Sequence, residues 1–122
     1  MKKIAIIEDD YAILDMYALK FKFAKFNVVT AKDGEEGLAV VEREKPDLIL
    51  LDLMMPVMDG TTMLTELRKM PWGKNLPVIV LTNISVDEMP HELDSLGVAD
   101  YVVKAGSTPQ LVVEKVKKLL KI

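Results

Sequence analysis

Short runs of branched apolar residues recur along the chain, separated by longer stretches that mix apolar and polar positions. The runs are continuous rather than alternating, which is typical of strands that are buried on both faces of a sheet. The predicted strands lie at residues 4–7, 28–29, 48–51, 78–81 and 101–103.

The stretches between and after these runs have the spacing of amphipathic helices. After the first run, Ile13, Tyr17 and Phe21 recur every four residues, which places them on one helical face. Residues that favour helix starts precede the other four predicted helices, because their side chains accept hydrogen bonds from free backbone N–H groups. These residues are Asp33, Asp59, Ser85 and Thr108.

Strands that alternate with helices predict right-handed crossovers and a parallel sheet covered on both faces. We therefore expect an α/β, doubly wound (βα)5 fold with a five-stranded parallel sheet in the order 2-1-3-4-5. In such sheets ligands bind at the carboxyl ends of the strands, where the strand order reverses. This point lies between the first and third strands.

Composition narrows the class of protein. A chain of 122 residues is the size of one domain, and its lack of cysteine excludes disulfides and thiolate metal sites. A formal charge of −3 argues against direct nucleic-acid binding. Because no apolar run approaches the ~20 residues of a membrane span, we expect no membrane partner and a cytoplasmic location.

The first polar residue after each of four runs is a candidate site residue. These residues are Glu8 with Asp9, then Asp52, Thr82 and Lys104. Three carboxylates at one edge of a sheet repel one another unless a cation joins them. Oxygen ligands without histidine or cysteine favour Mg²⁺, which commonly bridges carboxylates to a phosphate. The pattern therefore predicts phosphoryl chemistry.

In this arrangement the chain resembles the receiver domain of bacterial response regulators, of the stand-alone type, over essentially its whole length. The resemblance implies a flavodoxin-like fold and phosphorelay signal transduction in a two-component system. It rests on Glu8-Asp9, the Asp52–Gly60 loop, Thr82, Tyr101 and Lys104.

The resemblance also implies roles for individual residues. Asp52 is the acceptor of a phosphoryl group from a histidine kinase and becomes an aspartyl phosphate. Asp9, Asp52 and the backbone carbonyl of Met54 bind Mg²⁺ directly, and Glu8 binds it through water. Thr82 and Lys104 contact the phosphoryl oxygens.

The resemblance further implies a conformational switch at Thr82 and Tyr101. Movement of Thr82 opens a space for the aromatic ring of Tyr101, and this alters the surface of the fourth helix, fifth strand and fifth helix. Simpler explanations stay open for single residues: Thr82 satisfies a loop amide, Lys104 pairs with any of the carboxylates, and Tyr101 packs in the core.

Three features depart from the family pattern. Asn83 stands where a small residue is usual and narrows access to the acceptor. Ala105 replaces a proline that has a cis peptide bond, so this loop is either strained or rebuilt. Apolar Met54 and Ile84 occupy positions that modulate hydrolysis of the phosphate, which predicts a long-lived phosphorylated form.

We expect residues 1–122 to be a single receiver domain without an output domain. The chain then acts through partner proteins. The expected phosphoryl donor is a sensor histidine kinase or a histidine phosphotransfer protein, and the expected target is an effector protein or a second copy of the chain. We expect a self-modifying switch rather than a turnover enzyme. The alternative is a phosphorylation-independent interaction module, while a hydrolase is disfavoured because the chain lacks room for a cap domain.

Overall fold

The computed structural model describes residues 1–122, except for the side chain of Val86. Five strands form one parallel sheet in the order β2-β1-β3-β4-β5, which confirms the predicted topology. The strands are β1 (Lys3–Ile7), β2 (Asn27–Ala31), β3 (Leu48–Leu51), β4 (Val78–Thr82) and β5 (Asp100–Val103).

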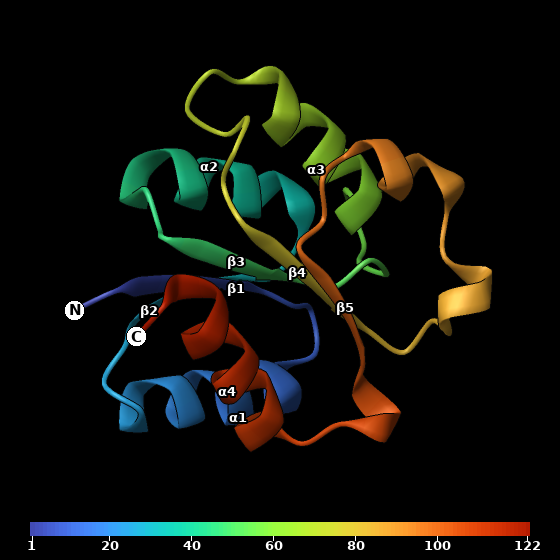
Figure 1. Cartoon of the computed structure of the whole chain (residues 1–122). Helices are drawn as coiled ribbons and strands as arrows, with labels where there is room; N and C mark the ends of the chain where they lie inside the picture. Colours follow the sequence, from blue (N-terminus) through green and yellow to red (C-terminus); the bar gives the residue numbers. More distant parts are fainter.

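Four α-helices cover the two faces of the sheet (Figure 1). Helices α1 (Tyr11–Phe23) and α4 (Pro109–Leu120) pack together on one face. Helices α2 (Gly34–Glu44) and α3 (Gly60–Lys69) pack together on the other. Each face has its own apolar core, and the two cores share the central strands β1, β3 and β4, whose side chains point alternately to either side.

Three of the predicted helix starts are confirmed by their capping hydrogen bonds. Asp33 accepts from the N–H of Glu36 at 2.8 Å, and Asp59 accepts from that of Thr62 at 2.8 Å. Thr108 caps α4 by accepting from Leu111 at 3.2 Å. These caps fix where α2, α3 and α4 begin, and α3 and α4 are the helices that follow the strand ends of Asp52 and Lys104.

The fourth predicted helix is not an α-helix. Two short 3₁₀ helices, η1 (Val86–Glu88) and η2 (His91–Ser95), connect β4 to β5. Ser85 does begin the first turn, but Pro90 interrupts it because proline has no backbone N–H and disfavours helical geometry at the preceding residue. The surface predicted to switch is therefore built from η1, η2, β5 and α4.

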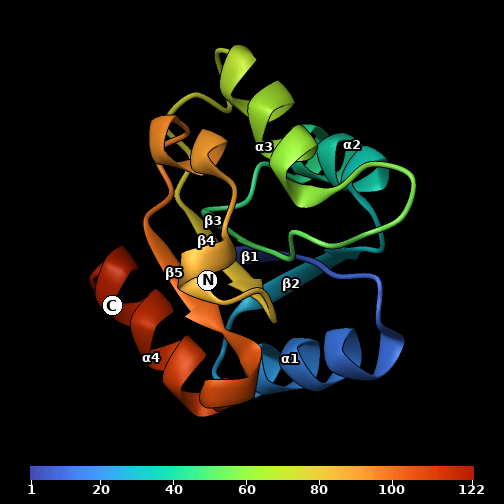
Figure 2. The same cartoon turned by 90° about the vertical axis from the view of Figure 1, so that its right-hand side faces the viewer.

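The carboxyl ends of the strands meet at the right-hand edge of the molecule in Figure 1, and Figure 2 views the molecule from that edge. The strands β1, β3 and β4 are neighbours there. In the part of the chain that the structure describes, no helix is long and apolar enough to span a bilayer.

Candidate functional site

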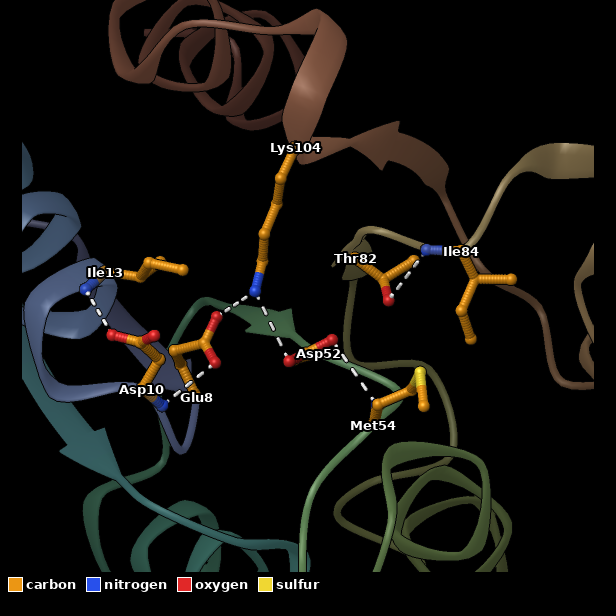
Figure 3. Close-up of polar contacts among 8 residues, drawn as sticks. All are labelled: Glu8, Asp10, Ile13, Asp52, Met54, Thr82, Ile84 and Lys104. Carbon is orange, nitrogen blue, oxygen red and sulfur yellow. Dashed lines mark hydrogen bonds and ion pairs between the residues drawn. The ribbon is translucent and has the colours of Figure 1, made fainter.

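The structure brings the predicted polar residues together at one edge of the sheet, and Figure 3 shows four of them: Glu8, Asp52, Thr82 and Lys104. Glu8 and Asp9 follow β1, Asp52 follows β3, and Thr82 is the last residue of β4. Lys104 begins the short 3₁₀ helix η3 (Lys104–Gly106) after β5. Glu8, Asp52 and Thr82 are buried and Asp9 is exposed, so the cluster is open to solvent on the side of Asp9.

Three carboxylates form a cluster suited to a hard cation. Ligand oxygens of Glu8, Asp9 and Asp52 all lie within 4.8 Å of one another. Three ionised carboxylates this close together repel one another, and a cation that binds oxygen ligands relieves the repulsion. The donor set therefore fits a divalent metal. For Met54, the structure shows a hydrogen bond from its backbone N–H to Asp52 at 3.4 Å, and the role of its carbonyl stays a prediction.

Lys104 supplies the positive charge of the site. Its ammonium group donates to Glu8 and, at 3.3 Å, to Asp52, and only 10% of its side chain is exposed. The ammonium thus lies between the two buried carboxylates (Figure 3). A cation that reaches both carboxylates is also placed to meet an anionic group that arrives at Asp52.

The loop after Lys104 is rebuilt rather than strained. Among the described residues there is no cis peptide bond, so the bond between Lys104 and Ala105 is trans. The chain turns through η3 instead, and the N–H of Ser107 donates to the carbonyl of Lys104 at 3.2 Å. The missing proline therefore leaves Lys104 in reach of the carboxylates.

Burial and charge shift the protonation of this cluster. Burial raises the pKa of Glu8 to about 7, the charge of Asp52 acts in the same direction, and the hydrogen bond from Lys104 opposes both. For Lys104, burial acts to lower the pKa, but the bond to Glu8 and the charge of Asp52 outweigh it and raise the pKa. Burial also raises the pKa of Tyr17, which the sequence placed on the apolar face of the first helix; the charge of Lys104 opposes this effect and the charge of Glu8 adds to it.

We expect the metal-free chain to lose stability as the pH rises through this range. The pKa of Glu8 is about 7 in the fold against 4.5 for an ordinary glutamate, so between these values the folded state binds more protons than the unfolded state. The free energy of unfolding then falls with rising pH, by about 3 kcal/mol for this group.

The measurement is urea unfolding in a chelator at about pH 5 and about pH 8, with Glu8→Gln as the control. The wild-type chain should lose more stability between the two conditions than the variant, which has no carboxyl at this position. Parallel pH profiles for the two proteins would contradict the shifted pKa.

The structure also places the two predicted switch residues. Thr82 is fully buried, and its hydroxyl accepts from the N–H of Ile84 at 3.5 Å, which satisfies a loop amide. Tyr101 lies on the neighbouring strand β5, paired with Val80 rather than with Thr82. It is half-buried, packs against the core beneath α2 and α3, and lines a cavity of ≈ 250 Å³.

That cavity separates Tyr101 from the two 3₁₀ helices. Its other lining residues come from the connection between β4 and β5: Asp87, Met89, Pro90, His91 and Asp94. Burial raises the pKa of the Tyr101 phenol, and the charge of Asp94 adds to this effect. The ring therefore has open space beside it as well as core contacts.

Comparison with known proteins agrees with this site and fold. Residues 4–116 match the family model of the response regulator receiver domain. The chain belongs to this family. Its fold and its general function, signal transduction by phosphorelay in two-component systems, are thereby confirmed as predicted.

Curated relatives include transcriptional regulators. The probable transcriptional regulator ycf27 of Porphyridium aerugineum is 39% identical over 111 residues, which cover 90% of this chain and 45% of the relative. The alkaline phosphatase synthesis transcriptional regulatory protein PhoP of Bacillus subtilis is 37% identical over 125 residues, which cover 98% of this chain and 49% of PhoP. The chain thus spans about half the length of these relatives.

Solved structures match over nearly their whole length. A CheY-like response regulator receiver domain protein from Methanospirillum hungatei has a TM-score of 0.89 at 31% identity, and the match covers 99% of this chain and 94% of that one. Chemotaxis protein CheY4 of Vibrio cholerae has a TM-score of 0.89 at 28% identity, with 97% and 98% covered.

Proposed function

We propose that Asp52 accepts a phosphoryl group from a phosphohistidine on a sensor histidine kinase or a histidine phosphotransfer protein. A carboxylate oxygen of Asp52 attacks the phosphorus atom, the bond from phosphorus to the imidazole nitrogen breaks, and its electron pair stays on the imidazole. The observation that supports this proposal is the position of Asp52, buried at the end of the central strand β3 between other carboxylates and the ammonium of Lys104.

The other residues of the cluster position and neutralise the reacting group. Asp9 and Asp52 would hold Mg²⁺ directly, with the carbonyl of Met54, and Glu8 would hold it through water. When bound, this ion neutralises charge on the phosphoryl oxygens. Lys104 pairs with a further phosphoryl oxygen, which requires it to loosen its present bonds to Glu8 and Asp52. The Thr82 hydroxyl donates to another.

The new hydrogen bonds bias the chain toward a second packing. Thr82 exchanges its contact with the N–H of Ile84 for a phosphoryl oxygen, and Tyr101 moves within the space beside the 3₁₀ helices. The surface of η1, η2, β5 and α4 changes as a result and binds an effector protein. The chain is therefore a switch that modifies itself and not an enzyme that turns over a metabolite.

The test is the intact mass of the chain after incubation with a phosphorylated sensor kinase, or with a small acyl-phosphate donor, in the presence of Mg²⁺. We expect one added phosphoryl group, and none when a chelator removes the metal, because the carboxylates then face the phosphoryl oxygens without a neutralising ion. Both donors are used, since Asn83 follows Thr82 directly with an exposed side chain, and a kinase and a small donor approach the acceptor differently.

If no donor labels the chain, a phosphorylation-independent interaction module becomes the better explanation. Asn83 is the feature that favours this second function, because it follows Thr82 directly, is exposed, and is larger than the small residue usual in the family at this position. In that case the effector would bind the unmodified chain as well as the donor-treated chain.

We expect the phosphorylated form to hydrolyse slowly for this family. Met54 is 66% exposed, Ile84 is half-buried, and neither side chain has a polar atom that orients an attacking water. The measurement is loss of the added mass with time after removal of the donor. Substitution of Met54 by glutamine, which offers an amide at the same position, should shorten the lifetime, and hydrolysis of the wild type within seconds would contradict the prediction.

A further inference from the structure

A cavity of ≈ 530 Å³ lies at the amino ends of β4 and β5, at the edge of the sheet opposite the carboxylate cluster. Pro77 and Ala99, the residues just before these two strands, line it together with the ends of α3 and η2. Pockets for small molecules typically measure ~300–1,000 Å³, so this cavity is large enough for a small organic ligand. None of the residues assigned to phosphoryl transfer lines it.

The polar side chains of this cavity are cationic or neutral. They belong to Arg68, Lys74, Asn75 and Ser95, and no acidic residue is among the described residues that line it. The whole chain has the opposite balance, with 19 acidic residues against 16 basic ones. Two cations without a carboxylate give the cavity a positive potential, which attracts anions.

The Arg68 guanidinium is held in place by backbone carbonyls rather than by an anion. It donates to the carbonyls of Leu96 at 2.8 Å, Gly73 at 2.9 Å, Leu76 at 2.7 Å and Gly97 at 3.2 Å. These bonds use four of its five N–H donors and orient the group, but neutral carbonyls do not cancel its charge. No ion pair in the described part of the chain involves Arg68.

Burial makes this uncompensated charge unfavourable. Arg68 is half-buried, and its partial removal from water lowers the pKa of the guanidinium. A guanidinium nevertheless stays charged at neutral pH, so the molecule holds a fixed and partly desolvated cation at the cavity. An anion that binds there gains a charge-assisted contact without having to order the arginine side chain.

The other side chains of the cavity suit the remainder of such a ligand. Lys74 is exposed and, within the described residues, forms no ion pair, so its ammonium group can turn toward an anion. Pro77 and the 40% exposed Leu119 supply apolar surface. We propose that this cavity binds a small organic anion whose phosphate or carboxylate group pairs with Arg68 and Lys74, and whose apolar part packs against Pro77 and Leu119. The proposal is independent of phosphorylation at Asp52.

The experiment is an NMR titration of the whole chain with phenyl phosphate and with benzoate. A chelator is present throughout, so that no metal ion draws the probes to the carboxylate cluster. The backbone amide signals of Asn75, Leu96 and Gly97 should shift with a Kd of about 1 mM for at least one of the two anions. Benzyl alcohol, which has the same ring without the charge, should bind at least about tenfold more weakly.

Lys74→Met is the decisive variant, because it removes the charge of an exposed side chain and keeps its apolar stem. It should weaken binding of the anion about fivefold. Lys22→Met, an exposed position of α1 on the other face of the sheet, makes the same change in net charge and should bind like the wild type. The variant at Lys74 is preferred to one at Arg68, whose bonds also hold two connections of the fold.

Three results would overturn the proposal. The first is the absence of shifts at Asn75, Leu96 and Gly97 with both anions. The second is equal binding of benzyl alcohol, which would mean that the cavity does not select charge. The third is unchanged binding by Lys74→Met, which would mean that the anion lies elsewhere on the chain.

Discussion

Replacing Asp52 by asparagine is expected to abolish incorporation of a phosphoryl group while leaving the chain folded. A neutral amide oxygen is a far weaker nucleophile than a carboxylate, and the loss of one negative charge also weakens cation binding to the cluster. Asparagine has nearly the same shape and still accepts hydrogen bonds, so the contacts with Met54 and Lys104 can persist. The measurement is intact mass after treatment with donor and Mg²⁺.

A second aspartate of the same loop provides the matched control. Asp59 caps α3 by accepting from the N–H of Thr62, and asparagine serves equally well at such a position. Asp59→Asn should therefore be labelled like the wild type. Equal labelling of Asp52→Asn and the wild type would mean that the acceptor is another residue. Labelling of neither control nor wild type would instead indicate that the chain does not accept phosphoryl groups from the donors used.

The sequence predicted the site well because the site depends on regular features of a parallel sheet. Continuous apolar runs mark buried strands, and the first polar residue after each run marks its carboxyl end. Since parallel strands bring these ends to one edge, Glu8, Asp52 and Thr82 had to converge once the strand order was known. The structure confirms this convergence, while the chemical role of each residue stays a prediction.

The connections were harder to predict because they depend on single residues and on tertiary contacts. Between β4 and β5, the start signal at Ser85 was right, but Pro90 outweighed it and left two 3₁₀ turns. After β5, sequence alone could not decide between strain and a rebuilt loop at Ala105, and the structure shows a 3₁₀ turn with trans peptides. The spacing of apolar residues along the chain gives no information about either connection.

Helix α1 shows a further limit of periodicity. The spacing of Ile13, Tyr17 and Phe21 predicted the buried face, and the last two are indeed buried in the core. The opposite face was expected to be polar, yet Leu19 and Phe23 are exposed there. When apolar residues lie on both faces of one helix, the sequence no longer distinguishes the buried face from the exposed one. Only the packed structure then shows which apolar residues lie outside the core.

Substitution of Gly60 by alanine is expected to have the largest effect on stability. A Cβ atom at this position would lie 2.2 Å from the carbonyl oxygen of Asp52 and 2.8 Å from the Cα of Leu53. Both atoms belong to the backbone that holds the acceptor, and the N–H of Gly60 also donates to the carbonyl of Leu53 at 3.0 Å. Neither can move without displacing Asp52, so we expect a loss of about 3 kcal/mol or more in the free energy of unfolding.

The matched control is Gly106→Ala, because a Cβ at Gly106 meets no atom within 4 Å. Its free energy of unfolding should change by less than about 0.5 kcal/mol. Urea unfolding of the three proteins measures the difference, and mass labelling of the Gly60→Ala chain under folding conditions measures the displacement of Asp52. Equal stability of the two alanine variants would mean that the β3–α3 loop yields to the added methyl group, and unchanged labelling would mean that Asp52 does not depend on the close approach of Gly60.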